Sequence, residues 1–196
     1  MAGTKDRLLT ATAELFRRQG YTGTGLKQIV AQAEAPFGSL YHFFPGGKEH
    51  LGAEVIRWSG AGYLALVGQF FDPAPDVATA IEWAFAGAGQ TLADTDYADA
   101  CPIATVALEV ASTNDNLRQA TEDVFESWIV TVAERFAAAG IEPEKARALA
   151  TSVLCLLEGA FLFCRAARDL APMAAAGASA ADLVRAALAD TASDSG

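Results

Sequence analysis

The sequence predicts an all-α protein of about nine helices, with an N-terminal three-helix unit followed by a larger helical region. Three observations support this class. Apolar residues recur at helical spacing along nearly all of the 196 residues, Gly and Pro residues separate the segments, and no stretch alternates apolar and polar residues as a strand does. With 52% hydrophobic residues, the chain can bury a substantial core.

Charge divides the chain into two parts of different character. Residues 1–58 hold seven Lys or Arg and five Asp or Glu, a charge of +2, within a chain whose formal net charge is −10. The remaining residues hold seven basic and 19 acidic residues, a charge of −12. Such asymmetry favours two functions in one chain, although the basic excess by itself is also compatible with ordinary surface charge.

Capping and helix-stopping residues give the expected bounds of each helix. In the N-terminal part, helices are predicted over 4–18, 24–33 with Thr24 as N-cap, and 36–44 with Pro36 in the first turn, and a long helix over 48–71 follows the Pro-Gly-Gly corner at 45–47. Later helices are predicted over 76–92, 102–111, 115–139, 143–170 and 178–189, with Asp76 as a cap and Pro172 as a break. Residues 191–196 are expected to be frayed.

Residues 24–51 have the pattern of a helix-turn-helix, which reads DNA with its second helix. Two short helical segments are joined by a tight turn, and the apolar positions predicted to form their small core are Ile29, Val30, Ala33, Leu40 and Phe44. The competing interpretation is a helical hairpin with a polar surface, because short patterns of this kind are common.

The side chains predicted to face DNA belong to two groups. The first group can bind phosphate through a hydroxyl group, a positive charge or a short-range hydrogen-bond donor, and comprises Thr24, Lys27, Tyr41, His42 and Lys48. The free N–H groups at the start of the long helix after Gly47 can bind phosphate as well. Those suited to base edges are Phe37, Gly38, Ser39 and Phe43. A hydroxyl can bond several base edges, an aromatic ring can contact the thymine methyl group, and glycine permits a close backbone approach.

The order of these motifs resembles the TetR/AcrR family of bacterial transcriptional repressors. The resemblance is carried by GYTGT at 20–24, IVAQA at 29–33, GSLYHFF at 38–44 and KEHL at 48–51. FPGGKE at 44–49 and CPIAT at 101–105 look like the branch near the lincomycin-resistance and multidrug-efflux regulators. The resemblance implies a homodimer that binds a double-stranded DNA operator and responds to a small effector.

Three residues depart from the family pattern. Glu34 stands where the family usually has Gly, Phe43 where it has His, and Phe37 where the branch often has a basic residue. If position 34 requires a positive φ, Glu34 is strained by about 1 kcal/mol. Because residues 36–44 then carry no Lys or Arg, we hypothesise that operator affinity rests on shape, apolar contacts and dimerisation. A log–log salt slope as steep as about −6 per dimer would contradict this.

The predicted domains are therefore a DNA-binding domain over 1–50 and an effector-binding and dimerisation domain over 51–196. The second has abundant aromatic residues, which either form ordinary helix-bundle core or line a cavity with a few polar groups. Glu158 lies in an apolar helix and needs a partner, either a ligand or a nearby arginine such as Arg165 or Arg168. The residues predicted to contact a lipophilic, neutral or cationic effector are Trp83, Gln90, Cys101, Thr105, Phe125, Trp128, Glu158, Phe161 and Arg165, with Glu109 as a further polar candidate.

Small residues in the segment 147–168 alternate with large ones. Together with the Ala-rich segment 178–189, this segment is expected to form an isologous four-helix interface between two copies of the chain, as the family resemblance implies. The small residues concerned are Ala148, Ala150, Thr151, Gly159 and Ala160.

Several classes of function are disfavoured by what the sequence contains. Both histidines, His42 and His50, lie in the N-terminal part, and no catalytic triad, Glu-x-x-His or phosphate-loop pattern occurs, so we expect no enzyme and no cofactor. The three cysteines have no metal-site spacing. The apolar run 153–164 is too short to span a bilayer and contains Glu158, so a cytoplasmic protein without membrane contact is expected. The alternative function is a helical ligand-binding or adaptor protein that has lost DNA binding.

Overall fold

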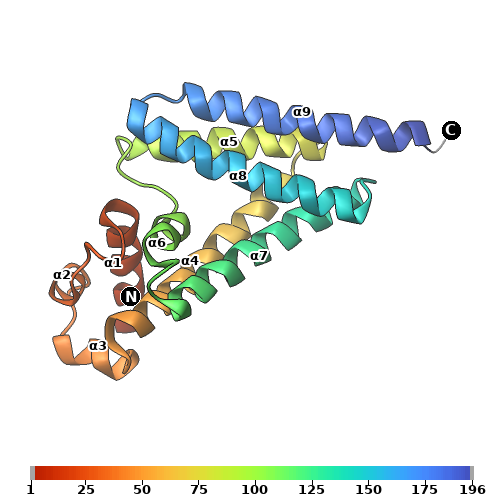
Figure 1. Ribbon diagram of the computed structural model, residues 1–196. Helices are drawn as coiled ribbons and strands as arrows, with labels where there is room; N and C mark the ends of the chain where they lie inside the picture. The colour runs from red at the N-terminus through yellow and green to blue at the C-terminus, as the bar shows by residue number, and fades with distance from the viewer. Residues whose placement is uncertain (1–2, 195–196) are drawn as a thin grey trace. The chain divides into compact units, whose positions relative to one another are not determined.

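The computed structural model describes residues 3–194, and these form nine helices and no strand (Figure 1). The predicted all-α class is therefore confirmed. The helices are α1 (Thr4–Gln19), α2 (Leu26–Gln32), α3 (Phe37–Phe43), α4 (Gly47–Phe71), α5 (Val77–Asp94), α6 (Pro102–Val110), α7 (Asp115–Ala138), α8 (Pro143–Ala167) and α9 (Ala171–Asp194).

Contacts within the chain define two compact units, each built from two stretches of sequence. Unit 1 comprises Met1–Gly62 and Asp99–Phe125, and unit 2 comprises Tyr63–Ala98 and Glu126–Gly196. The division falls inside α4 and α7, so each of these helices contributes to both units. The predicted functional boundary after residue 50 lies within unit 1 and remains a proposal about function.

Unit 1 is organised around the apolar face of α1, against which α2, α3 and α6 pack. Leu8 and Phe16 of α1 are completely buried in this core. The five residues predicted as the small helix-turn-helix core are likewise buried, namely Ile29, Val30, Ala33, Leu40 and Phe44. The burial of Leu40 places one side of α3 against the unit and leaves the other side to solvent.

The turn between α2 and α3 requires a left-handed residue. Glu34 has φ 48. This is the positive φ considered for position 34, where the family usually has glycine. Two hydrogen bonds from α1 hold this turn, because Arg7 Nε donates to the carbonyl of Ala33 at 3.0 Å and an Arg7 terminal nitrogen donates to that of Glu34 at 3.3 Å. The chain therefore keeps a strained backbone here and supports it with a guanidinium from another helix.

The prediction that Thr24 is an exposed N-cap is wrong. Gly25 occupies the N-cap position of α2. The Thr24 side chain is buried, and its hydroxyl donates to the carbonyl of Gly20 at 2.7 Å and accepts from Gln19 Nε2. The hydroxyl therefore closes the turn after α1, which leaves it unable to cap the next helix.

The expected bounds of the last two helices also need correction. α8 ends at Ala167, because Arg168 takes a left-handed conformation with φ 53. Pro172 begins α9 instead of breaking α8, since proline is tolerated in a first helical turn and α9 starts at Ala171. The helix then continues to Asp194, so residues 191–194 are helical and not frayed, whereas 195–196 lie outside the described residues.

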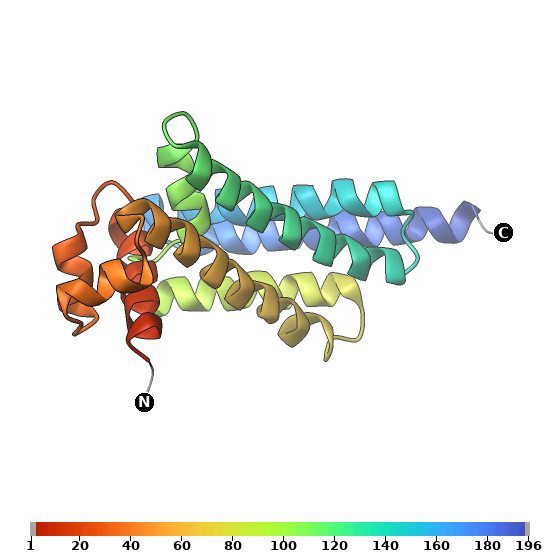
Figure 2. The same cartoon turned by 90° about the horizontal axis from the view of Figure 1, so that it is seen from below.

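Unit 2 is built around α9, which lies along both α5 and α8 (Figures 1 and 2). The fully or nearly fully buried core side chains include Phe85 of α5, Phe136 of α7 and Val184 of α9. Asp76 caps α5 as predicted, since its carboxylate accepts from the backbone N–H of Thr79 at 2.8 Å. Apolar side chains of α5 and α9 therefore pack against each other in the core of unit 2.

Replacing Glu34 by glycine is expected to stabilise the protein. Glycine has no Cβ penalty at positive φ, and this gain exceeds the added entropy of the unfolded chain, so Glu34→Gly should raise the free energy of unfolding by about 1 kcal/mol. Urea denaturation followed by circular dichroism measures the change. Glu34→Ala is the matched control, which keeps the strain, and a glycine variant no more stable than the alanine variant contradicts the expectation.

Candidate nucleic-acid interface and effector region

The outer side of α3 carries an aromatic pair. Phe37 and Tyr41 are 43% and 47% exposed, and their ring centroids lie 5.8 Å apart at an interplanar angle of 53°. They are one helical turn apart, which places them on the same face. Gly38 and His42 are also exposed, and Ser39 is half-buried. The recognition helix predicted from sequence therefore presents these residues to solvent.

Two lysines lie on the helices that flank α3. Lys27 is exposed on α2. Lys48 is half-buried in the first turn of α4, where its ammonium lies 4.4 Å from the centroid of the Tyr21 ring. Burial lowers the pKa of Lys48, an effect partly offset by the charge of Glu109. The ring thus orients this ammonium without neutralising it.

Among the residues predicted to contact DNA, Thr24 is the exception. Its side chain is buried and bonded within the turn, so it offers no hydroxyl to a phosphate. The other predicted residues are exposed or half-exposed and lie on α2, α3 or the start of α4, namely Lys27, Phe37, Gly38, Ser39, Tyr41, His42, Phe43 and Lys48.

Several other cations of unit 1 are engaged with carboxylates. Arg17 and Arg18 both bond Asp99, with nitrogen–oxygen distances of 3.0 and 3.2 Å. Lys5 pairs with Glu54 at 3.5 Å. These pairs reduce the positive charge that unit 1 can offer to a phosphate backbone, in line with the hypothesis of few cation–phosphate contacts.

Glu109 of α6 has a role that the sequence interpretation missed. Its carboxylate accepts the backbone N–H groups of Tyr21 and Thr22 at 3.1 and 2.7 Å. At Gly20 φ is +75, and a Cβ built on that residue would lie 1.7 Å from Glu109 Oε1. The carboxylate therefore caps the turn after α1, and the glycine makes room for it. No local pattern signals this contact, because residues 20 and 109 are far apart in sequence.

Comparison with known proteins decides the family. Residues 8–55 match the family described as bacterial regulatory proteins, tetR family, and residues 77–179 match the LmrA/YxaF-like C-terminal domain of transcriptional regulators. The chain belongs to the TetR family of bacterial transcriptional regulators. The helix-turn-helix of unit 1 is accordingly a DNA-binding element.

Curated relatives of this TetR-family regulator cover most of its length. It is 32% identical to YxaF, an HTH-type transcriptional regulator of Bacillus subtilis (strain 168), over 86% of this chain and 88% of that protein. It is 33% identical to an HTH-type transcriptional regulator of Mycobacterium tuberculosis over 88% and 90% of the two chains. LmrA of Bacillus subtilis is 28% identical over 86% and 90%.

Solved structures share the fold. A TetR transcriptional regulator from Legionella pneumophila has a TM-score of 0.81 at 21% identity and covers 92% of this chain and 96% of its own. Reduced NemR of Escherichia coli has a TM-score of 0.74 at 22% identity, with coverages of 90% and 94%.

Three predicted effector residues belong to unit 1. Cys101 is the N-cap of α6, where its sulfur accepts from the backbone N–H of Ala104. Thr105 donates its hydroxyl to the carbonyl of Cys101 at 2.8 Å. Phe125 is half-buried on α7. The first two side chains therefore stabilise the start of α6, whatever else they contact.

The other six predicted effector residues belong to unit 2. Gln90 is exposed and donates to Asp94, so its predicted contact with an effector stays a prediction. Arg165 donates to the backbone carbonyls of Tyr97 and Ala98 and so holds the loop after α5. The remaining four differ in burial: Trp83 is exposed, and Glu158 and Phe161 are half-buried. Trp128 is buried, and its ring contacts that of Tyr63.

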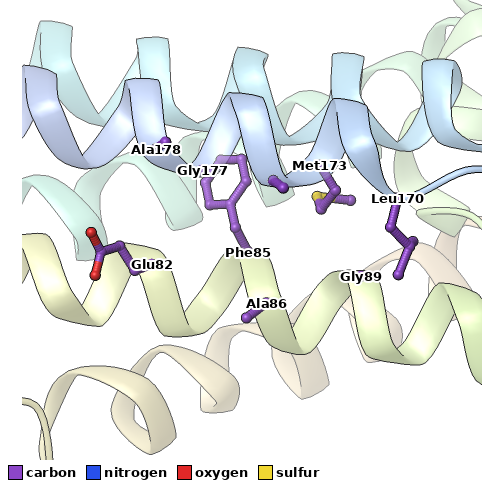
Figure 3. Close-up of a pocket in the computed structure, with 9 residues that line it drawn as sticks. Glu82, Phe85, Ala86, Gly89, Leu170, Met173, Gly177 and Ala178 are labelled. Carbon is purple, nitrogen blue, oxygen red and sulfur yellow. The ribbon is translucent and has the colours of Figure 1, made fainter.

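A groove between α5 and α9 was not predicted (Figure 3). It has a volume of about 310 Å³, and its lining residues are Glu82, Phe85, Ala86, Gly89, Leu170, Met173, Ala174, Gly177 and Ala178. Figure 3 shows Phe85 reaching from α5 toward α9, with Glu82 at one end and Leu170 at the other. Among the described residues, none of those predicted to bind an effector lines this groove.

Removal of the Glu109 carboxylate is expected to weaken unit 1. Glu109→Ala leaves the N–H groups of Tyr21 and Thr22 without this acceptor, at a cost of about 1–2 kcal/mol in the free energy of unfolding, because solvent reaches part of the site. Chemical denaturation measures the loss. Glu54→Ala, which removes a half-exposed carboxylate of the same unit that pairs with Lys5 at 3.5 Å, should change stability by less than about 0.5 kcal/mol. Equal effects of the two substitutions would contradict the assigned role.

Proposed function

We propose that the protein is a repressor that binds operator DNA as a homodimer and is released by a small lipophilic effector. The observation that carries the proposal is the solvent-exposed face of α3, where Phe37, Tyr41 and His42 project from the second helix of a TetR-type helix-turn-helix. The absence of Lys and Arg from α3 favours a second candidate, a helical ligand-binding or adaptor protein that has lost DNA binding.

DNA contacts are proposed to divide between positioning and reading. Lys27 and Lys48 contact phosphates from either side of α3, and Tyr41 and His42 add short-range donors. Phe37, Gly38 and Ser39, at the start of α3, approach the base edges in the major groove. Because each protomer offers two lysines and has a net charge of −10, the complex depends on steric fit and on two helix-turn-helix units, one from each protomer.

The proposed dimer face is an uncharged stripe along α8. Its members recur at three- and four-residue spacing and are exposed, except for the half-buried Gly159: Ala148, Thr151, Ser152, Cys155, Gly159, Leu162, Phe163 and Ala166. Leu162 and Phe163 are 64% and 65% exposed, and Leu183 of α9 is also exposed. By contrast, Ala150 and Ala160 face the core of unit 2. A second copy of the chain would remove the stripe from water.

The composition of α8 is consistent with such an interface. Within the part of the chain that is described, α8 is the one helix long and apolar enough to cross a membrane by length and composition, with a mean hydropathy of 1.6 over a window that is 28% buried. We propose that a helix partner covers its exposed side, and that the regulator acts in the cytoplasm.

The effector is proposed to bind among the apolar helices of unit 2 and to change the orientation of α4. Drug-sized ligand pockets usually begin at about 300 Å³, so the α5–α9 groove is large enough for a small ligand. Its apolar lining favours a neutral lipophilic molecule, because the carboxylate of Glu82 at its edge already pairs with Arg185 at 2.6 Å. Because α4 contributes to both units, tilting it would alter the spacing of two reading heads. Thermodynamic linkage requires DNA and effector to weaken each other equally.

The DNA-binding proposal predicts a measurable and shallow salt dependence. Selection from random duplex DNA with the full chain should enrich one palindromic sequence. Fluorescence anisotropy on that duplex should give a log–log salt slope shallower than about −6 per dimer. Lys27→Ala and Lys48→Ala should each weaken binding to all sequences similarly and reduce the slope by about 1 per protomer.

Lys145→Ala is the matched control, because this exposed lysine lies on α8 and pairs with Asp190. It should leave DNA affinity unchanged. If no sequence is enriched and no binding occurs at low salt, the repressor proposal is rejected in favour of the adaptor or ligand-binding alternative.

The dimer proposal predicts that a charge on the α8 stripe separates the protomers. Leu162→Glu should raise the dimer dissociation constant at least about 100-fold, because an unpaired carboxylate would be buried in an apolar interface at a cost of about 3 kcal/mol. Sedimentation equilibrium gives the constant. Leu108→Glu, at an 84% exposed position on α6, should leave it unchanged. A Leu162→Glu protein as dimeric as the original chain would place the interface elsewhere.

A further inference from the structure

We infer that Phe37 determines operator specificity by contacting a thymine methyl group in each half-site. This inference rests on the proposed function, since it concerns the same DNA-binding surface. It assigns to one side chain the choice of base, which neither the family match nor the relatives' names provide.

The position of Phe37 opens it to a partner at the start of α3. It is the first residue of the helix, after Pro36 at the N-cap. Its ring stays 43% exposed, although it is held against the ring of Tyr41. Leu40, three residues further along the helix, is completely buried and anchors α3 to the unit, while the aromatic pair stays exposed. A ring that is both exposed and supported loses little conformational freedom on contact.

The chemistry of α3 favours apolar contact as a means of reading a base, beside the hydroxyl of Ser39. Its sequence, FGSLYHF, has no Arg, Lys, Asn or Gln, the side chains that bond guanine or adenine in pairs of hydrogen bonds. In the major groove the one apolar group is the C5 methyl of thymine. An exposed phenyl ring at the start of the recognition helix is complementary to that methyl group and to no other feature of the groove.

Gly38 keeps the space beside Phe37 open. A Cβ built on Gly38 would meet nothing within 4 Å, so the packing of unit 1 does not require glycine there. Its φ is also outside the left-handed region that would demand glycine. A side chain at this position would project into solvent and hold the backbone of α3 away from base edges. The missing side chain therefore favours close seating of the ring on DNA.

The expected effect of one methyl group follows from hydrophobic transfer. Burial of one methyl-sized group is worth about 0.8 kcal/mol, which corresponds to about a fourfold change in Kd. A symmetric dimer makes the contact twice, so removal of both methyl groups should weaken binding about fifteenfold.

The experiment uses the full chain and the duplex enriched from random DNA. Each thymine is replaced in turn by deoxyuridine, in both half-sites together, which removes the methyl group and leaves base pairing unchanged. Binding of the original chain should weaken about fifteenfold at one symmetric position. Phe37→Ala should bind the methylated duplex more weakly and show no difference between thymine and uracil at that position, whereas Phe37→Leu should retain part of the difference.

Leu108→Ala is the control, because it removes an exposed apolar side chain from another helix of the same unit. It should keep the full thymine preference. Unchanged circular dichroism and thermal unfolding of Phe37→Ala establish that the variant is folded.

Two outcomes would overturn the inference, and they differ in what else they affect. If the original chain binds its selected duplex equally well after every replacement, or if Phe37→Ala keeps the same preference, Phe37 does not read thymine and the repressor proposal stands. If no sequence is enriched at all, both proposals fail together.

Discussion

The guanidinium of Arg7 holds the turn between α2 and α3 by donating to the carbonyl oxygens of Ala33 and Glu34. The orientation of the DNA-facing surface depends on this contact. Glu34 takes a positive φ that a glutamate disfavours, and the two hydrogen bonds from α1 support that conformation. Leu40 then packs into the core, and Phe37 and Tyr41 are directed outward. A strained turn tied to the first helix thus determines which face of α3 meets the solvent.

Local pattern is sufficient for most of the fold and for the exposure of most residues proposed to contact DNA. Helical periodicity, Asp76 as a cap and the Pro-Gly corner identified the elements, since each depends on neighbours within a few residues. The prediction for Thr24 is wrong because its hydroxyl can either accept from an N–H of the following helix as a cap or donate to a carbonyl of the preceding turn, and it donates to Gly20 in the turn after α1. Pro172 was misjudged for a related reason, since proline both ends one helix and opens the next.

Contacts between segments that are distant in the chain could not be predicted from local sequence pattern. The α5–α9 groove joins residues near 85 to residues near 175, and its small lining residues have no meaning until the two helices are placed together. The same holds for Glu109, whose chain position suggested a ligand contact and whose carboxylate instead binds the backbone of Tyr21 and Thr22. Aromatic content alone likewise did not separate buried Trp128 from exposed Trp83.

The close approach of Glu109 to Gly20 has an evolutionary consequence. The carboxylate oxygen occupies the volume where a side chain at position 20 would begin. A side chain at position 20 would require the carboxylate of Glu109 to move away, at the cost of its hydrogen bonds to Tyr21 and Thr22, and would also be strained at a φ of +75. An acid at position 109 should therefore be accompanied by glycine at position 20 among relatives, linking the turn after α1 to a helix that follows it far along the chain.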